Sequence, residues 1–328
     1  MQRIITSLCF CISSSVCNAY LGICYSIAIR TGKIYFHEHC CSYLVAHNTR
    51  TPPLTNSDSM MHTQQILFEL ASEQRLSILF KLTEHDSKLA KLSKDLNVTM
   101  QEVHRNLSRL MDAGLIEKDS AGTFSLTTFG SAIITQTSTF GFLSRNRSYF
   151  SEHIFGEIPM KFIHRIGALD NSEYVSGFVA VIELWKQLYN RSSEYIYGML
   201  PQIPLDLIEA LMPKIMNEGI KFNYILPKNA IVPKNRAEIL RNSGYQELLR
   251  KGVVERRMVD QIQLAVVLSE NQATVMFPNL KHETDMNSMF YSSGLRVDNG
   301  IFHEWCLDFF RNNWYNSMSF DESKLIEV

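Results

Sequence analysis

Side chains that can hydrogen-bond to DNA bases recur in the segment from Thr99 to Arg109. The amide of Gln101 can pair with adenine, and the guanidinium of Arg105 with guanine, each through two hydrogen bonds. Residues four positions apart share one face of a helix, so Gln101 and Arg105 would point the same way. We take four residues near the helix start as candidate base contacts: Thr99, Gln101, Glu102 and Arg105. Arg109 lies further along and is a candidate phosphate contact.

A helix over residues 99–112 would position these side chains. Thr99 is suited to the N-cap, and Glu102 can complete a capping box. An apolar stripe at helical spacing predicts the buried face: Met100, Val103, Leu107, Leu110 and Met111. The opposite face carries Gln101, Arg105, Ser108, Arg109 and Asp112. This polar face is typical of a recognition helix, whose first turns reach the bases.

The flanking patterns complete a winged helix-turn-helix. A helical pattern from Ser87 ends in a turn at residues 96–98, directly before the recognition helix. Gly114 stops that helix, and strand-like runs at 115–118 and 123–126 enclose a turn at 120–122. Residues 72–75 open an earlier helix, which is expected to turn Leu76, Leu79, Phe80 and Leu82 inward.

Lysines flank the recognition helix on both sides. Lys88, Lys91 and Lys94 lie on or near one face of the helix that precedes the turn, and Lys118 falls on the wing. Contacts from such side chains to phosphates position a protein on DNA without reading its sequence. We therefore add these four lysines to the candidate DNA-binding residues.

Three runs resemble the ArsR-type winged-helix repressors of bacteria and archaea. They are Val103-His104-Arg105-Asn106-Leu107-Ser108-Arg109-Leu110, Ala113-Gly114-Leu115-Ile116 and Phe124-Ser125-Leu126-Thr127-Thr128-Phe129-Gly130. The resemblance covers about residues 70–130 and implies a winged helix that binds double-stranded DNA. The chain departs from the family at His104, where Ser is frequent, and at Asn106, where His is frequent. No Cys lies near the recognition helix, so the metal-sensing thiolate site of the founding members is missing. We predict no metal and no cofactor.

A winged helix can also serve only as a protein-interaction scaffold, and this is the alternative function. Two arginines, one glutamine and three lysines on the expected outer surface favour DNA instead. Salt-dependent DNA binding would discriminate between the two functions.

Composition limits the possible classes of protein. A length of 328 residues suffices for two domains, and 45% hydrophobic with 20% charged residues is ordinary for soluble domains. The net charge of −1 gives no overall basic signal, so a DNA-binding surface must gather its cations on one face. Six of the seven cysteines precede the motif at spacings that match no zinc site. The remaining Cys306 fits a reducing, cytoplasmic environment.

Residues 1–60 differ in composition from the rest of the chain. No charged residue occurs from Ile4 to Ile29, and Glu38 is the single acidic residue before Asp58. Three interpretations compete. The segment could be a secretory signal, or a weak membrane anchor that leaves the following domains cytoplasmic because Arg30 and Lys33 flank it. It could also lie upstream of a true start at Met60 or Met61, which we favour, and we expect it to be disordered.

We divide the remaining chain into a winged helix at 61–130, a connector at 131–157, an effector domain at 158–318 and a tail at 319–328. The connector is rich in apolar residues: Ile133, Ile134, Phe140, Phe142, Leu143, Tyr149 and Phe150. Winged-helix regulators often dimerise through such a helix, and a homodimer matches a pseudo-palindromic DNA site. The alternative is a plain connector between domains.

Beyond Ile158-Pro159, predicted helices and strands alternate. Helices are expected at 175–189, 205–218, 236–249 and 301–315, and strands at 194–198, 221–226, 253–258, 264–268 and 273–277. The alternation predicts a layered α/β domain, so the fold class is α/β, or α+β for the whole chain. Residues 221–227, 264–277 and 302–314 resemble the effector domains of archaeal winged-helix regulators, including those linked to methanogenesis control. Similar endings occur in archaeal sensor domains that look like degenerate phospholipase-D folds, which implies a ligand-sensing or interaction module.

We predict no enzymatic activity and no catalytic residues. Phospholipase-D chemistry uses an H-x-K-x-x-x-x-D motif, whereas Glu304 and Trp305 follow His303. No G-x-S-x-G, H-E-x-x-H or P-loop motif occurs either.

Two other features of the effector domain bear on ligands. A basic segment could bind an anionic effector or further DNA, or form a solvated surface with balanced charge, which we favour. It comprises Lys221, Lys228, Lys234, Arg236, Arg241, Arg250, Lys251, Arg256 and Arg257. Four aromatic residues are predicted sheet core that could line a pocket in a sensor: Tyr195, Tyr197, Phe222 and Tyr224.

Overall fold

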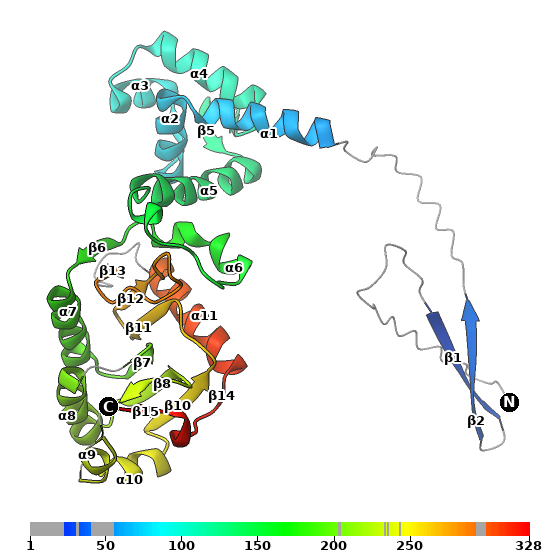
Figure 1. Ribbon diagram of the computed structural model, residues 1–328. Coiled ribbons are helices and arrows are strands. Elements are labelled where there is room, and N and C mark those ends of the chain that lie inside the picture. The colour runs from blue at the N-terminus through cyan, green and yellow to red at the C-terminus, as the bar shows by residue number, and fades with distance from the viewer. Residues whose placement is uncertain are drawn as a thin grey trace. The chain divides into compact units, whose positions relative to one another are not determined.

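The computed structural model describes residues 23–30, 33–40, 56–202, 205–232, 234, 236–242, 244–292 and 300–328 (Figure 1). The chain divides into two compact units, Met1–Thr63 and Gln64–Val328. Helix α1 (Asn56–Leu70) belongs to both, because its last turns lie in the second unit. No helix in the described part of the chain is long and apolar enough to cross a membrane.

The first unit contains an antiparallel pair of strands, β1 (Ile23–Arg30) and β2 (Lys33–Cys40). The described end of the uncharged stretch therefore forms a strand, where we expected disorder. Ile and Tyr recur at every second position from Ile23 to Ile29, and this alternation favours a strand. Residues 4–22 and 41–55 lie outside the described residues. Helix α1 begins at Asn56, within the stretch for which we expected disorder.

The winged helix of the second unit has the predicted order of elements. It consists of α2 (Glu73–Glu84), β3 (Ser87–Lys88), α3 (Leu89–Leu96), α4 (Met100–Asp112), β4 (Ile116–Lys118), β5 (Thr123–Leu126) and the start of α5 (Thr128–Arg145). The strands form an antiparallel sheet in the order β3-β5-β4, of which β3 was not predicted. The core includes Leu79 of α2, Leu92 of α3 and Val103, Leu107 and Leu110 of α4.

Two residues expected in this core lie at the surface. Met100 is 58% exposed, because as the first residue of α4 its side chain lies beyond the packed part of the apolar stripe. Phe80 is 46% exposed, since α2 instead buries Arg75, Ile78, Leu79 and Leu82. Polar Asn106 is buried on α4, where Nδ2 donates to Gln74 Oε1 at 2.8 Å. A buried amide requires such a partner.

Helix α5 serves two hydrophobic cores. Ile134 packs in the core of the winged helix, whereas Phe142 packs in the core of the following domain. Tyr149, of the short 3-10 helix η1 (Tyr149–Ser151), and Ile158 also belong to that second core. The effector-domain core therefore begins before the boundary that we drew at residue 158.

The effector domain is built on one mixed sheet of eight strands, in the order β14-β10-β8-β7-β11-β12-β13-β6. The strands are β6 (Glu173–Ser176), β7 (Tyr195–Met199), β8 (Lys221–Pro227), β10 (Val254–Val259), β11 (Ala265–Ser269), β12 (Ala273–Met276), β13 (Ser288–Ser292) and β14 (Met318–Ser319). The pairs β7–β8 and β8–β10 are parallel and the others antiparallel. Strands β11, β12 and β13 are buried at every position, as expected for strands covered on both faces.

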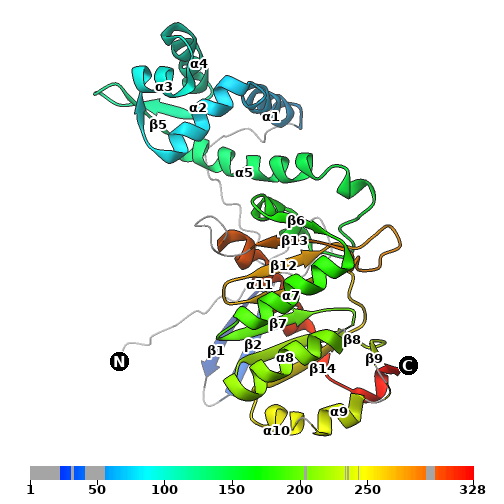
Figure 2. The same ribbon diagram turned by 90° about the vertical axis from the view of Figure 1, so that its left-hand side faces the viewer.

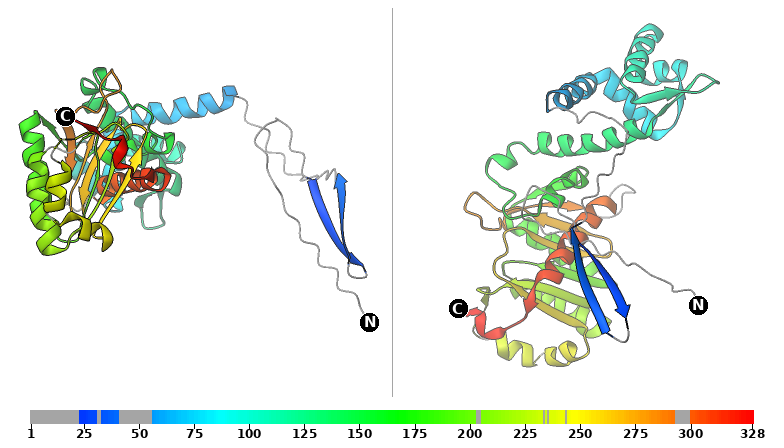
Figure 3. Two further views of the ribbon diagram at one scale, coloured as in Figure 1. Left: turned by 60° about the horizontal axis from the view of Figure 1, so that its bottom comes forward. Right: turned by 90° about the vertical axis from the view of Figure 1, so that its right-hand side faces the viewer.

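Helices cover both faces of this sheet, as Figures 1 and 3 show. Helices α7 (Phe178–Arg191) and α8 (Leu205–Glu218) lie on one face, and α11 (Gly300–Asn316) lies on the other. Trp185 of α7 donates to Thr274 Oγ1 at 3.1 Å, and Trp305 of α11 donates to the Phe162 carbonyl at 3.1 Å. The α/β layering predicted from the sequence is therefore confirmed.

Smaller elements complete the domain: α6 (Met160–Ile163), η2 (Ile166–Leu169), β9 (Ile231–Val232), α9 (Arg236–Asn242), α10 (Tyr245–Arg250), η4 (Glu322–Lys324) and β15 (Ile326–Glu327). The helix predicted at 236–249 is divided into α9 and α10, with Gly244 at a φ of 70°. The helix predicted from residue 175 begins at Phe178, because Glu173–Ser176 is strand β6. Residues 319–328, which we set apart as a tail, pair with the domain through β14 and β15.

Candidate nucleic-acid interface

The start of α4 is fixed by the capping box that the sequence predicts. Thr99 N donates to Glu102 Oε2 at 3.0 Å, and Glu102 N donates to Thr99 Oγ1 at 3.3 Å. The Thr99 hydroxyl also donates to Glu102 Oε2 at 2.9 Å. Hydrogen bonds from Thr99 hold the pKa of the Glu102 carboxyl below its ordinary value. Both side chains are thus engaged in the cap, so a base contact by either would compete with it.

Gln101 and Arg105 are the predicted base contacts that remain exposed on the outer face of α4. His104 is exposed on the same helix, and Ser108 Oγ donates to its carbonyl at 3.1 Å. An amide and a guanidinium one turn apart, near the helix N-terminus, can each offer paired hydrogen bonds to a base edge.

Arg109 is committed to an ion pair that the sequence did not indicate. Its Nη2 donates to Glu69 Oε1 at 2.7 Å, and its guanidinium lies 5.2 Å from the centre of the Phe68 ring. The Glu69 hydrogen bond raises the pKa of Arg109 above its ordinary value. A phosphate contact by Arg109 would have to use the part of its side chain that this pair leaves exposed. The phosphate contact expected of Arg109 stays a prediction, and the ion pair with Glu69 is a second role that the sequence did not indicate.

The turn between α3 and α4 is closed by local hydrogen bonds. Asn97 adopts a left-handed conformation at a φ of 52° and ends α3, and Ser93 Oγ donates to the Val98 carbonyl at 2.6 Å. Lys91 and Lys94 are exposed on α3, and Lys88 is exposed in β3 directly before it. The three lysines thus belong to the segment that leads into the recognition helix.

The wing is the β4–β5 hairpin, whose loop projects from the domain (Figure 2). Asp119 Oδ1 accepts from Thr123 N at 2.7 Å, and Gly122 takes a φ of 80° in the turn. Lys118 is exposed, and its Nζ lies 5.4 Å from the centre of the Phe124 ring. Its stem is thereby held against the sheet while the ammonium group stays in water.

Of the nine candidate residues, the structure leaves six exposed on the helix-turn-helix and the wing and engages three in local contacts. Gln101, Arg105, Lys88, Lys91, Lys94 and Lys118 form the first set, which we call the outer polar set. Thr99, Glu102 and Arg109 form the second. Among the residues that the structure describes, no group of three or more His, Cys, Asp or Glu side chains is placed to hold a metal ion.

The basic segment of the effector domain is paired with carboxylates close by. Lys221 lies 3.1 Å from Glu255, Lys251 lies 3.5 Å from Glu247, and Arg256 pairs with Glu322. Arg250 also pairs with Glu247, and Lys228 with Asp260. These contacts support the interpretation that the segment is a surface of balanced charge.

The four aromatic residues expected in the sheet core divide between its two faces. Tyr197 stacks on Phe310 of α11, and the Tyr195 hydroxyl lies 3.4 Å from His303 Nε2. Phe222 and Tyr224 instead line a cavity on the other face. Parallel strands in register explain the division, because side chains alternate between faces along each strand.

Comparison with known families gives a match in the part of the chain that contains the winged helix. Residues 63–147 match the family model of the HVO_A0261 N-terminal domain. The match includes the winged helix and α5 and covers about a quarter of the chain. No curated protein matches the chain.

The solved structures that resemble this chain do so with low TM-scores. TrmBL2, an archaeal chromatin protein, is 15% identical over 80% of this chain and 99% of its own, with a TM-score of 0.34. HlyU from Vibrio cholerae is 26% identical over 23% of this chain and 87% of its own, with a TM-score of 0.22. A phospholipase D family member, Nuc from Salmonella typhimurium, is 14% identical over 46% of this chain and 99% of its own, with a TM-score of 0.31. None of these likenesses is close enough to assign a function.

Proposed function

We propose that the chain is a transcriptional regulator that binds double-stranded DNA through its winged helix. The observation that carries the proposal is the exposed pair Gln101 and Arg105 at the start of α4, which the capping box of Thr99 and Glu102 holds in a helical geometry. Side chains at this position reach base edges when the second helix of a helix-turn-helix enters the major groove.

Each exposed residue has a part in this proposal. Gln101 and Arg105 read bases, whereas Lys88, Lys91, Lys94 and Lys118 contact phosphates on either side. Arg109 has a positioning part instead, since it ties α4 to Glu69 of α1.

The proposal includes a homodimer and a signal received by the effector domain. Most apolar residues of the connector pack within the chain itself, so a dimer contact would use what α5 leaves exposed, such as Phe129 and Phe140. Sedimentation of the full chain at several concentrations tests the dimer. The proposal includes no catalytic step, and we expect no turnover of a phosphodiester such as bis(p-nitrophenyl) phosphate.

The deciding experiment is selection of bound duplexes from a random DNA pool, followed by titration of the enriched sequence by fluorescence anisotropy. We expect Arg105→Ala to weaken specific binding by about 1–3 kcal/mol and to leave non-specific binding nearly unchanged. Arg147→Ala is the matched control, because Arg147 is an exposed arginine outside the winged helix.

Two results would decide against the proposal. No enrichment of any sequence, together with no salt-dependent binding by a folded protein, would leave the alternative that the winged helix is a protein-interaction scaffold. Equal loss from Arg105→Ala and Arg147→Ala would remove the assignment of α4 as the reading element.

A further inference from the structure

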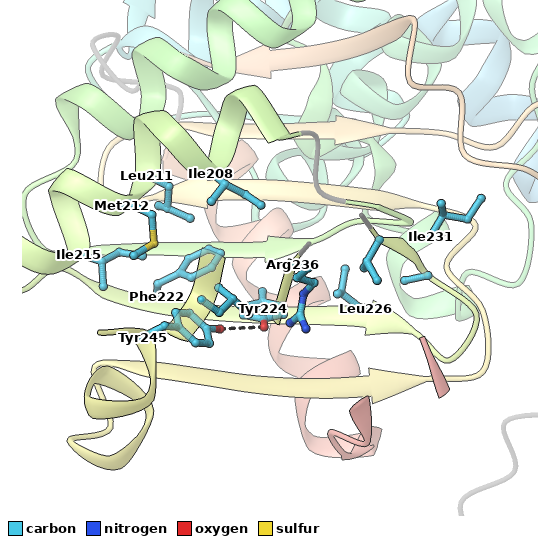
Figure 4. Close-up of a pocket in the computed structure, with 13 residues that line it drawn as sticks. Ile208, Leu211, Met212, Ile215, Phe222, Tyr224, Leu226, Ile231, Arg236 and Tyr245 are labelled. Carbon is cyan, nitrogen blue, oxygen red and sulfur yellow. Dashed lines mark hydrogen bonds between the residues drawn. The ribbon is translucent and has the colours of Figure 1, made fainter. Parts of the chain in front are cut away.

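A cavity of about 50 Å³ lies on the face of the sheet covered by α8, between β8 and the α9–α10 pair (Figure 4). Its walls are mostly apolar and include Leu211, Met212 and Ile215 of α8, Phe222 and Leu226 of β8, and Leu240 of α9. A cavity needs roughly 10–15 Å³ on this scale to hold one water molecule, so the space admits roughly four groups of that size. This is the room that a short alkyl chain requires.

One end of the cavity is polar and rich in hydrogen-bond donors. The hydroxyls of Tyr224 and Tyr245 lie 2.8 Å apart, and Figure 4 shows the Arg236 guanidinium directed toward them. Burial raises the pKa of the Tyr245 phenol well above its ordinary value of 10. One of the two phenols donates to the other, so the second O–H can donate a hydrogen bond to an acceptor at this end.

A second arginine stands beside the same tyrosine. Arg256 of β10 is in register with Tyr224 of β8, so their side chains leave the sheet on the same face. Burial alone would lower the pKa of Arg256, but Tyr224 and Glu322 outweigh it and raise that pKa. The side chains of Arg236 and Arg256 are only 12% and 18% exposed. Arg236 lines the cavity, and Arg256 lies beside Tyr224, which also lines it. These two mostly buried cations require an anion near that wall.

In this structure the chain supplies that anion from its own C-terminal segment. The Glu322 carboxylate pairs with Arg256 and lies 3.8 Å from Arg236 Nη1. The Phe320 ring lies 4.3 Å from the Arg256 guanidinium, and Ile326 pairs with Ile231 through strands β15 and β9. The distance to Arg236 exceeds that of a hydrogen bond, so Glu322 satisfies the two arginines unequally.

We propose that this cavity binds a short-chain monocarboxylate of about four to six carbons, with its carboxylate between Arg236 and Arg256 in place of Glu322. The apolar walls contact the alkyl chain. The two arginines and the unshared phenol O–H donate hydrogen bonds to the carboxylate. Both arginines repel a cation. A neutral molecule cannot replace Glu322 as the counter-charge of the two arginines. Because one carboxylate replaces another, binding leaves no buried guanidinium unpaired.

The exchange has a consequence for residues 318–328. Glu322 and Phe320 attach this segment to Arg256, and β15 attaches it to β9, which also lines the cavity. A ligand carboxylate that displaces Glu322 removes the first of these attachments and loosens the segment. The inference concerns the effector domain alone and does not rest on DNA binding.

Isothermal titration of the full chain with sodium hexanoate tests the site. Acetate has the charge without the chain, hexan-1-ol has the chain without the charge, and hexylammonium has the opposite charge. We expect hexanoate to bind with one site per chain and at least about tenfold more tightly than any of the three, since charged hydrogen bonds supply that order of affinity. Equal binding of hexan-1-ol and hexanoate, or no binding of hexanoate, would overturn the proposal.

Variants locate the site and identify the competing group. Met212→Trp fills the cavity and should abolish hexanoate binding. Glu322→Gln removes the competing carboxylate and should tighten binding by about tenfold, whereas Arg256→Gln should weaken it by at least as much. Circular dichroism checks that each variant is folded. If Arg256→Gln does not fold, Arg256→Lys replaces it in the binding measurement. Binding that Met212→Trp leaves unchanged, or that Glu322→Gln does not tighten, contradicts the assignment.

Limited trypsin digestion reports on the C-terminal segment directly. Lys324 lies in η4, two residues after Glu322, so loosening of this segment should speed cleavage after Lys324. We expect hexanoate, but not acetate, to accelerate this cleavage in the parent chain, and Glu322→Gln to be cleaved faster without any ligand. Cleavage at an unchanged rate in hexanoate would show that Glu322 is not displaced.

Discussion

Arg109 donates two hydrogen bonds to the carboxylate of Glu69, from Nη2 to Oε1 at 2.7 Å and from Nε to Oε2 at 3.2 Å. Glu69 also pairs with the buried Arg75, whose Nε lies 2.7 Å from Oε2. Arg75 in turn donates to the carbonyls of Phe68 and Glu69 at the end of α1. A single carboxylate therefore joins α1, α2 and α4.

The first prediction concerns this network. Glu69→Ala should destabilise the winged helix by about 3 kcal/mol, because it leaves the mostly buried Arg75 without its counter-charge. Arg109→Ala should cost about 1 kcal/mol or less, since the Arg109 side chain is 41% exposed. Hydrogen exchange of peptides from α1 and α4 measures both. Equal losses in the two variants would show that Arg109, rather than Arg75, carries the energy of the network.

The second prediction separates capping by Thr99 from base contact. Thr99→Ala should cost about 1 kcal/mol of stability because α4 loses its N-cap, and Thr99→Ser should restore most of it. Thermal unfolding monitors the stability, and anisotropy with the selected DNA monitors binding. If Thr99 acts through the cap, DNA affinity follows stability in both variants. Full stability with lost affinity in Thr99→Ser would instead indicate a base contact by the threonine methyl group.

The third prediction concerns the lysines of α3. Lys91→Gln and Lys94→Gln should each weaken binding about equally for specific and random DNA, and should lower the salt dependence of log K by about 1. Affinity measured from 50 to 200 mM salt gives the slope. Lys281→Gln, an exposed lysine of the effector domain, is the control and should leave the slope unchanged. A specific loss without a change of slope would contradict a phosphate contact.

The fourth prediction tests the close approach of Gly130 to the backbone of Leu115, directly before β4. A Cβ atom at Gly130 would lie 1.8 Å from the Leu115 carbonyl oxygen, so the backbone would have to move. Gly130→Ala should destabilise the winged helix by about 3 kcal/mol or more. Gly198→Ala is the matched control, because a Cβ there meets no atom within 4 Å. Calorimetric melting temperatures compare the two, and similar melting temperatures would refute this account of Gly130.

The fifth prediction is a pH dependence. Burial alone would raise the pKa of Asp285, but hydrogen bonds from Ser288, Asn287 and His153 outweigh it and hold that pKa below its ordinary value of 3.8. A depressed acid stabilises the fold above its unfolded pKa, and this contribution is lost as pH falls through the folded pKa. Asp285→Asn should therefore cost about 1–3 kcal/mol at pH 7 and less at pH 3.

Urea unfolding of the effector domain at both pH values measures this effect. Glu304→Gln is a control at an exposed carboxylate of α11. A cost that is the same at pH 7 and pH 3 would show that Asp285 acts through packing rather than through its charge.

The sequence determined the elements whose signals are local. The apolar stripe and the Thr99–Glu102 capping box predict α4, and Gly114 predicts where it ends. Strands β4, β5, β7 and β8 follow from alternation or continuous apolar runs within a few residues of their predicted bounds. These features depend on neighbours within one or two turns, and such neighbours are visible in a linear sequence.

Short strands, and contacts between residues distant in the chain, could not be predicted from the sequence. Strands β3, β9, β14 and β15 have only two residues each, too few to show a period, and exist because a neighbouring strand pairs with them. The exposure of Met100 and the burial of Asn106 depend on what packs against α4, which its own pattern does not record.

By itself, the sequence determined the winged helix-turn-helix, the layered α/β domain and the set of polar residues that could meet DNA. Only the tertiary structure decided which of those residues are committed elsewhere. Glu69 lies 40 positions before Arg109, and Glu322 lies 66 positions beyond Arg256, yet each pair is in contact. The physical reason is that a guanidinium pairs with the carboxylate that the fold brings to it, and the fold, rather than the order of residues, sets which carboxylate that is.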